Sequence, residues 1–550
     1  MTSAARAGQR DEDAGYVVVG AGSAGCVLAS RLSAGCGERV VLVEAGGPAS
    51  RAEIAIPAAF PTLFGSSCDW DYRTTAQPGL AGRALRWPRG KVLGGSSSLN
   101  AQIWTRGHRA DYDGWAAAGC AGWGMDDVAP YFQRAEGREG GDAGGAAGYG
   151  TDGPTRIEDL RDPSPATTDF LAACAAAGLP PLGDGEMPAR GGAGPVRATQ
   201  RNGRRWSSAD AYLRRPQENL SVITGCHVTR VLIEGSRAVG IEYRTGQGSF
   251  RIAAAREVII AAGAVGSPQL LMLSGIGDAD HLRAQGIGVQ SHSPEVGRNL
   301  GDHLYLPLAF AAREPVSPGI GDMSGEIARY VRERRGRLTS NIAEAVAFLR
   351  SSDEVTAPDL EFVWMLLPFL GRGEPTDHGV TLGVVLLRPA SSGQIRLRSA
   401  DPHVHPVIDP GYLSDAGRED LRVLTAGVRR AGEVLRQPAL SRWLGAPLTP
   451  EPARDGPEAT QSLIRSGAET LFHPVGTCRM GAEPGTVLDL QFRVRGVAGL
   501  RVVDASAMPS IPRGHTHAPT VMLAERAADM ILDRAAGRQL PNPRKDVQEQ

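Results

Sequence analysis

The most chemically informative part of the chain is a glycine-rich turn between two apolar runs, residues 20–25 (GAGSAG). The apolar run before it, residues 16–19, and the Ala/Leu-rich segment after it predict a strand, a tight turn and a helix. Gly20 permits the turn, Gly22 lets the backbone approach a pyrophosphate, and Gly25 lets the helix pack close to the sheet. The helix N-terminus would then offer unpaired N–H groups to the phosphates.

A second apolar run, Val40–Val43, ends in an acidic residue that completes this pattern. Glu44 follows Gly20 by 24 positions, close to the roughly 20 expected for an acid that binds ribose hydroxyls. A GxGxxG pattern alone is weak evidence in a chain with 71 glycines, but strand, turn, helix, strand and acid together are specific. The opening segment therefore predicts that the protein binds an adenine dinucleotide.

The composition argues against several other kinds of partner. Lys and Arg total 59 against 60 Asp and Glu, so the formal net charge is −1. Because the chain has no basic stripe or polybasic cluster, neither nucleic acid nor an anionic membrane is an expected partner. The first fifteen residues lack the apolar stretch of a secretion signal, and no run approaches the roughly 18 apolar residues of a membrane span. We therefore expect a cytoplasmic protein without a membrane span.

The cysteines give no sign of a cross-linked or metal-bound protein. The chain has seven of them, an odd number, scattered and without a CxxC pair. This pattern supports neither a disulfide framework nor a zinc site, and we expect no metal.

Strand patterns far apart in the chain indicate that the dinucleotide-binding domain is discontinuous. Residues 256–262 (REVIIAA) and 500–504 (LRVVD) each have the pattern of a buried strand followed by a helix-prone stretch. A second domain would be inserted between them. Its strand-like segments are residues 342–349, 360–366, 380–387 and 393–398. The Gly/Ala-rich residues 138–150 have the composition of a surface loop.

Three further blocks resemble a known family. They are residues 90–104 (GKVLGGSSSLNAQIW), residues 263–277 (GAVGSPQLLMLSGIG) and residues 472–525, which contain FHPVGTCRMG, VVDASAMPS and GHTHAPTVMLAE. In content and order they resemble the glucose–methanol–choline (GMC) family of flavin-dependent alcohol oxidoreductases. The nearest branches are the choline dehydrogenase-like and the pyridoxine or aryl-alcohol oxidase-like ones. The resemblance implies that the dinucleotide is FAD rather than NAD.

The resemblance also implies an α/β fold. A Rossmann-like FAD-binding domain would be assembled from residues 14–154, 216–299 and 476–540. An α+β substrate-binding domain, residues 155–215 and 300–475, would be inserted into it and built on an antiparallel sheet.

The glycine motif and the resemblance together assign a set of residues to FAD. Asn100 matches the asparagine that faces the isoalloxazine ring, and Asp504 and Ala505 match the strand end near the ribityl chain and pyrophosphate. Val228 matches a valine whose backbone contacts the adenine, although a plain strand explains that segment equally well. The full set is Gly20, Gly22, Ser23, Ala24, Gly25, Glu44, Ala45, Val92, Gly94, Gly95, Ser96, Asn100, Val228, Asp504, Ala505 and His517.

Position 99 bears on how FAD would be held. Some members of the family attach FAD covalently through a histidine at this place, which is leucine here. Leucine cannot form that bond, so we expect non-covalent FAD.

Two of the eleven histidines match the catalytic pair of the family. His473, followed by PVGT, matches the histidine near flavin N5, and a neutral imidazole suits the general base that alcohol oxidation requires. His517 matches its partner, which is asparagine in many relatives. We assign His473 as the base and His517 as hydrogen-bond partner, although His517 could also accept the proton. We expect His515 to point away or line the entrance, and His108 and His303 to serve helix ends or packing.

The expected reaction is oxidation of a primary alcohol to an aldehyde by hydride transfer to flavin N5. The alternative is a cyanohydrin (hydroxynitrile) lyase of the same fold, which binds FAD without using it for electron transfer. Residues 361–370 (EFVWMLLPFL), with Trp364, Met365 and Phe369, could line the substrate pocket or form core. The electron acceptor, whether O₂, a quinone or a carrier protein, and the oligomeric state are left open by the sequence.

Overall fold

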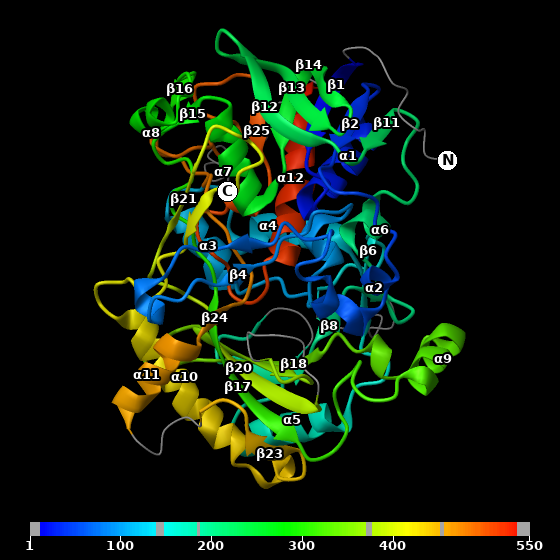
Figure 1. Ribbon diagram of the computed structural model, residues 1–550, viewed down its shortest axis with the longest axis vertical. Coiled ribbons are helices and arrows are strands. Elements are labelled where there is room, and N and C mark those ends of the chain that lie inside the picture. The colour runs from blue at the N-terminus through cyan, green and yellow to red at the C-terminus, as the bar shows by residue number, and fades with distance from the viewer. Residues whose placement is uncertain (1–11, 139–147, 184–186, 370–376, 451–455, 536–550) are drawn as a thin grey trace, which may run out of the picture.

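The computed structural model describes residues 12–138, 148–183, 187–369, 377–450 and 456–535. Two seven-stranded sheets lie toward opposite ends of an elongated molecule (Figure 1). The first has the order β11 (Leu220–Ile223), β2 (Val40–Val43), β1 (Glu12–Val19), β14 (Gly248–Ile260), β13 (Arg237–Thr245) and β12 (His227–Glu234), with β25 (Leu500–Val502) beside β14. The second has the order β23 (Leu444–Pro447), β17 (Leu304–Ala312), β20 (Gly379–Leu386), β19 (Leu360–Met365), β18 (Ala343–Leu349) and β7 (Gly192–Pro195), with β24 (Glu469–Thr470) beside β17.

The first sheet has the predicted Rossmann-like core. Strands β11, β2, β1, β14 and β25 run parallel, while β12 and β13 add an antiparallel hairpin. All four residues of β2 are buried, as expected for a parallel strand covered on both faces. The strand predicted at 256–262 is the second half of the longer β14. Strands from the beginning, middle and end of the chain thus share one sheet.

The first and last helices of the chain pack against each other beside this sheet (Figure 1). They are α1 (Ser23–Gly35) and α12 (His517–Ala535), and a Cβ on Gly35 would lie only 2.4 Å from Leu532. Buried Glu525 of α12 accepts hydrogen bonds from Arg31 of α1 and from Arg134 of α4 (Met125–Ala135). The N-terminus of α12 is therefore fixed relative to the glycine-rich turn.

The second sheet is antiparallel, and its central strands β18, β19 and β20 are buried at every position. Three of the four predicted strand segments form these strands. The fourth forms β21 (Gln394–Arg396), which pairs only with β22 (Val407–Asp409) in a separate hairpin. Helices α5 (Pro165–Ala176) and α10 (Glu419–Leu435) pack on this sheet.

The strands of the second sheet all come from within residues 155–215 and 300–475, where the substrate-binding domain is expected. The domain boundaries themselves stay a prediction. Residues 139–147 of the expected loop and residues 536–540 of the expected last segment lie outside the described residues.

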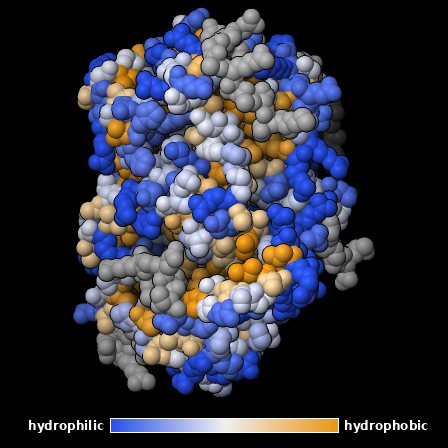
Figure 2. Space-filling view, turned by 45° about the vertical axis from the view of Figure 1, so that its right-hand side comes forward, coloured by the Kyte–Doolittle hydropathy of each residue, from blue (hydrophilic) through white to orange (hydrophobic). Residues whose placement is uncertain are grey.

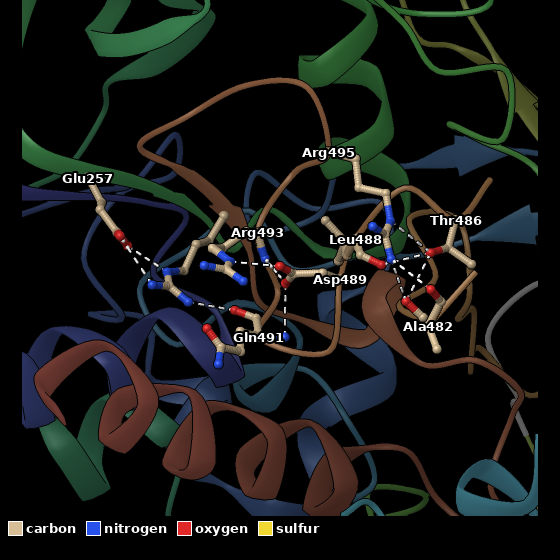
Figure 3. Close-up of polar contacts among 10 residues, drawn as sticks. Glu257, Ala482, Thr486, Leu488, Asp489, Gln491, Arg493 and Arg495 are labelled. Carbon is tan, nitrogen blue, oxygen red and sulfur yellow. Dashed lines mark hydrogen bonds and ion pairs between the residues drawn. The ribbon is translucent and has the colours of Figure 1, made fainter. Parts of the chain in front are cut away.

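A polar network holds β25 at the edge of the parallel strands (Figure 3). The guanidinium of Arg501, 1 % exposed, bonds both carboxylate oxygens of Glu257 on β14, at 2.5 and 3.1 Å, and the carbonyl oxygen of Gln491. A buried Arg–Glu pair with this bidentate geometry specifies a unique position for the strand. Asp504, two residues beyond β25, is positioned by it.

Within the part of the chain that the structure describes, no helix has the length and apolar character needed to cross a bilayer. In the same residues, no group of three or more His, Cys, Asp or Glu side chains is placed to hold a metal ion. The face in Figure 2 is largely hydrophilic, and one group of hydrophobic residues on it lies below the middle of the molecule.

Candidate active site

A large cavity opens between the two sheets. Its empty space, the open mouth included, is about 2130 Å³. The carboxyl ends of β1, β2, β14 and β25 form one side, where open α/β sheets bind their ligands, and residues of β17, β18 and β19 form the other. The cavity therefore has two halves. The dinucleotide half lies at the strand ends of the first sheet, and the other half is made by the second sheet.

Thirteen of the sixteen residues assigned to FAD line this cavity: Gly20, Gly22, Ser23, Ala24, Glu44, Ala45, Gly95, Ser96, Asn100, Val228, Asp504, Ala505 and His517. Gly25, Val92 and Gly94 do not. They lie behind the lining and hold its backbone in place. The N–H of Gly94 donates a hydrogen bond to the carbonyl oxygen of Ala21, and Val92 forms a β-bridge with Gly47.

The three motif glycines have the positions that a dinucleotide requires. Gly20 has φ +97°, in the left-handed region, and a Cβ on Gly25 would lie 1.8 Å from the carbonyl oxygen of Gly20. A Cβ on Gly22, in contrast, would meet nothing nearer than Gly95 at 4.0 Å and would project into the open cavity. The backbone at Gly22 is thus accessible to a pyrophosphate, and the residues present are compatible with FAD.

Two acids at strand ends organise the dinucleotide half. Glu44 accepts hydrogen bonds from the N–H groups of Ala21 and Gly46, both at 2.8 Å, and burial raises its pKa to about 7. Asp504 accepts from the N–H of Gly263 at 2.8 Å, at the start of α7 (Gly263–Leu273), and burial raises its pKa as well. Each acid holds a turn whose backbone lines the cavity.

The loop that carries His473 is held in a strained conformation. Phe472 has φ +65°, uncommon for a bulky residue, and it lines the cavity together with Gln102 (φ +64°) and Ile342 (φ +69°). Non-glycine residues in this region concentrate at functional sites. Asp302, which is buried, accepts a hydrogen bond from the backbone N–H of His473 at 2.7 Å and fixes the loop.

The hydrogen bonds of His303 determine the tautomer of His473. Burial lowers the pKa of His303 to about 3, so its ring is neutral. Its Nε2 lies 3.1 Å from the carbonyl oxygen of Leu387 and must donate, because a carbonyl only accepts. Nδ1 of His303 is then an acceptor, and the Nδ1 of His473, 3.0 Å away, must carry the hydrogen. Nε2 of His473 is left with a free lone pair.

Of the two places expected for His515, pointing away or lining the entrance, the first is wrong, because His515 lines the cavity and contacts His473. The two ring centroids are 4.9 Å apart at an interplanar angle of 81°, and both side chains line the cavity. His515 is held there by Glu361 of β19, whose Oε1 lies 3.1 Å from its Nε2. The expectation of a mere packing role for His303 was also wrong, because it bonds His473 directly.

Burial keeps His473 unprotonated. Burial lowers the pKa of His473 well below 6.5, and the guanidinium of Arg89 adds to this effect. One side of the His473 ring faces the cavity, and protein atoms surround its other sides. The imidazole is therefore available as a neutral base at pH 7.

His517 is the first residue of α12, and its described contacts differ from those of His515. Its Nδ1 lies 3.1 Å from the hydroxyl oxygen of Ser23 in the glycine motif, and its ring meets Trp104 edge-on. Burial, followed by the charge of Arg205, lowers the pKa of His517 to about 4. His517 thus links the dinucleotide motif to the cavity as a neutral hydrogen-bonding group.

The half of the cavity made by the second sheet is apolar. The two-residue period of β19 turns Val363 and Met365 into the cavity and buries Trp364, which stacks on Phe170. Phe369 lines the cavity too. Of the three side chains suggested by the sequence, two therefore form wall and one forms core.

Some residues of the site had no sequence signal. Arg205 donates hydrogen bonds from Nη1 to Oδ1 of Asn100 at 2.8 Å and to the carbonyl oxygen of Ser97. The basic stretch of sequence in which it lies does not indicate these contacts. Arg89 donates to the carbonyl of Phe472. Glu361 is an acid in an otherwise apolar strand, a signal that could have indicated a buried partner.

Comparisons with known proteins agree with this architecture. Residues 14–305 and 389–524 match the two family models described as GMC oxidoreductase. The chain is 41% identical to an alcohol dehydrogenase [acceptor] of Pseudomonas putida, over 94% of this chain and 95% of that protein. It is also 41% identical to the mitochondrial choline dehydrogenase of Homo sapiens, over 96% of this chain and 91% of that protein.

Solved structures show the same fold. Pyridoxine 4-oxidase from Mesorbium loti superposes with a TM-score of 0.85 at 34% identity, covering 96% of this chain and 99% of that one. A variant of the formate oxidase of Aspergillus oryzae, studied for the modification of its FAD, superposes with a TM-score of 0.89 at 26% identity, covering 96% and 100%. By its sequence, its fold and the arrangement of its cavity, the chain belongs to the GMC oxidoreductase family.

Proposed function

We propose that this enzyme oxidises a primary alcohol to an aldehyde with FAD as the cofactor and His473 as the general base. The observation that carries the proposal is the free lone pair on Nε2 of His473, which follows from the His303 hydrogen bonds, on a side chain that lines the cavity. When bound, FAD would supply the acceptor for the hydride of the carbinol carbon. The protein would position the alcohol and accept its hydroxyl proton.

The roles of the surrounding side chains follow from their contacts. An alcohol donates hydride well only as its hydroxyl proton leaves, and Nε2 of His473 can accept that proton. His517 would hydrogen-bond the substrate oxygen from the α12 terminus. Gly22, Glu44 and Asp504 would hold the dinucleotide at the strand ends. The electron acceptor that completes turnover is O₂, a quinone or a carrier protein.

We expect the FAD to be held without a covalent bond. Leu99, which lines the cavity at the place where some relatives carry a histidine, has no group that can attach to the flavin. Precipitating the purified protein with acid should release the yellow chromophore into the supernatant. A pellet that stays yellow would show a covalent link.

The lining of the cavity favours an uncharged alcohol over choline. Beyond Glu44 and Asp504 in the dinucleotide half, Arg89 is the one permanently charged side chain among the described residues of the lining. Its guanidinium repels a quaternary ammonium, and the wall formed by Val363, Met365 and neighbouring residues offers an apolar surface. Neutral benzylic or medium-chain primary alcohols should have kcat/KM values at least about tenfold above choline.

An anaerobic titration with a panel of alcohols tests this function. The panel contains choline, benzylic and furanic alcohols, pyridoxine, simple alkanols and sugars. Loss of the visible band of oxidised flavin, with one equivalent of aldehyde formed, is the expected result for the neutral alcohols, and admitting air then shows whether O₂ restores the band. A flavin that no alcohol bleaches, in a protein that cleaves mandelonitrile, would make it a lyase instead.

A further inference from the structure

Arg205 is a buried cation whose hydrogen bonds all go to uncharged oxygens. The residue is 3 % exposed, and its partners are the carbonyl oxygens of Ile54 and Ser97, at 2.9 and 3.1 Å, and Oδ1 of Asn100 at 2.8 Å. Its Nη2 is buried and has no hydrogen-bond partner in the part of the chain that the structure describes. Burial lowers its pKa to about 9, an effect that the charge of Asp210 partly offsets, so Arg205 still carries its charge at pH 7. A buried charge without a counter-charge in contact is costly, and a ligand that brings negative charge would offset that cost.

The local structure places this cation behind the wall of the cavity. Arg205 ends β10 (Arg204–Arg205), which forms a short hairpin with the strand before it. Because successive side chains of a strand point to opposite sides, Arg204 is exposed and Arg205 is buried. Arg205 does not line the cavity, but its partners Ser97 and Asn100 do. The guanidinium is therefore separated from the cavity by the residues that it holds.

Arg205 fixes which way the amide of Asn100 faces. Oδ1 of Asn100 accepts hydrogen bonds from Nη1 of Arg205 at 2.8 Å and from the backbone N–H of Gln102 at 3.1 Å. Both partners can only donate, so the amide atom between them must be the oxygen. Nδ2 of Asn100 has no partner among the described residues, and its hydrogens are available to an acceptor in the cavity that Asn100 lines.

The charge of Arg205 reaches the part of the cavity assigned to the flavin. Asn100 matches the residue that faces the isoalloxazine ring, and His517 lines the same cavity. After burial, the charge of Arg205 is the next cause that lowers the pKa of His517. The guanidinium therefore acts on two residues of this wall. Protein rather than water lies between it and the cavity, and buried charges are screened much less than exposed ones.

We propose that Arg205 is a positioning residue for FAD: it turns the amide hydrogens of Asn100 toward the flavin, and its charge favours reduced over oxidised flavin. The inference rests on the proposed function. When the alcohol is oxidised, its O–H proton bonds to His473, and its carbinol hydrogen leaves with the electron pair of the C–H bond. Hydride transfer therefore adds one negative charge to the flavin. A fixed cation and fixed N–H donors stabilise such a charge without having to reorient.

Arg205→Met tests the role of the charge, because methionine keeps much of the length of the side chain but removes its charge and its donors. The midpoint potential of the bound flavin should fall by at least about 30 mV, which is a tenfold loss in the preference for reduced over oxidised flavin. Equilibration with a redox dye under anaerobic conditions measures this potential. Arg205→Lys keeps the charge but not the forked donors, and its potential should lie closer to that of the wild type.

Asn100→Asp is an independent test that keeps the contacts of Arg205. The carboxylate can still accept from Arg205 and from the N–H of Gln102, so the fold should be retained. It pairs with the cation, however, and it presents an oxygen to the cavity in place of the amide hydrogens. The potential should again fall by at least about 30 mV. This variant decides the question if Arg205→Met does not fold.

Arg204→Met is the matched control. Arg204 is the exposed neighbour on the same strand, and its loss should change neither the potential nor the Kd for FAD, measured by fluorescence titration of the apoprotein. An equal fall of the potential in this variant would show that the position of Arg205 is irrelevant and would overturn the inference.

Two simpler roles of Arg205 give a different result. If it only neutralised the phosphates of FAD, Arg205→Met would weaken the binding of oxidised and reduced FAD equally, and the potential would not change. If it only supported the fold, the melting temperature would fall, again without a change in potential. An unchanged potential in Arg205→Met or in Asn100→Asp therefore overturns the inference.

The two proposals fail in different ways. The potential is measured with dithionite and dyes and without any alcohol, so it tests Arg205 even if no alcohol reduces the wild-type flavin and the proposed function is wrong. If alcohols reduce the wild type while both variants keep the wild-type potential, the function stands and the role of Arg205 is wrong.

Discussion

Replacing His473 with alanine is expected to slow flavin reduction by the best alcohol about 10²- to 10⁴-fold, the usual cost of losing a positioned general base. The cause is specific: the ring presents an unprotonated Nε2 because its Nδ1–H is committed to His303. FAD should stay bound, because none of the described contacts of the His473 ring reach the glycine motif. Stopped-flow measurement of the anaerobic reduction rate, with the FAD content of each preparation, provides the check.

His292→Ala is the control for this variant. His292 is an exposed histidine in β16 (Ser291–His292), outside the lining of the cavity, and its loss should leave the reduction rate unchanged. His517→Asn should be milder than His473→Ala, because asparagine keeps a hydrogen bond to the substrate oxygen. If His473→Ala kept near wild-type rates while His517→Asn abolished reduction, His517 would be the base.

Placing a methyl group on Gly22 is expected to weaken FAD binding strongly without unfolding the protein. The nearest atom to the added Cβ is Gly95 Cα at 4.0 Å, so the protein itself tolerates Gly22→Ala. The methyl group would occupy the open space that a pyrophosphate needs, and an overpacked contact costs about 1–3 kcal/mol. We therefore expect a Kd for FAD about 5- to 150-fold higher. Fluorescence titration of the apoprotein with FAD measures it.

Two other glycines separate steric effects on binding from effects on folding. Gly37→Ala adds a methyl group with no atom within 4 Å, away from the cavity, and should change neither FAD affinity nor the melting temperature. Gly25→Ala places a Cβ 1.8 Å from a backbone oxygen and should lower the melting temperature of the apoprotein. Unchanged FAD affinity in Gly22→Ala would contradict the assignment of the motif to a pyrophosphate.

Local patterns were sufficient to predict β1, β2, the second half of β14 and β25 in the first sheet and β18, β19 and β20 in the second. They did not predict other strands of these sheets, such as β11, β13, β17 and β23. The run Val40–Val43 is short, continuous and apolar and is followed by Glu44, as parallel strands that end at a binding edge usually are. The glycine motif predicts its own geometry, because only glycine tolerates the turn at Gly20 and the contact at Gly25. The positions of these residues therefore depend on interactions between residues that are close together in the sequence.

The partners of His473 could not be predicted in the same way. His303 lies 170 positions earlier, and Glu361 lies 154 positions before His515, so no local pattern connects them. Their contacts arise only when β19 and the loops before β17 and α12 are packed around the cavity. Without that packing, His515 and His517 are two similar histidines two residues apart, and no local pattern places His515 against His473.

Hydride transfer from the alcohol to the flavin is tested by the rate of flavin bleaching with an alcohol deuterated at its carbinol carbon. Under anaerobic single-turnover conditions, the dideuterated alcohol should bleach the flavin several-fold more slowly than the protiated one. The amount of aldehyde formed should equal the amount of flavin reduced. If no alcohol bleaches the flavin, or if aldehyde forms from a cyanohydrin while the flavin stays oxidised, the enzyme does not oxidise alcohols by hydride transfer to FAD.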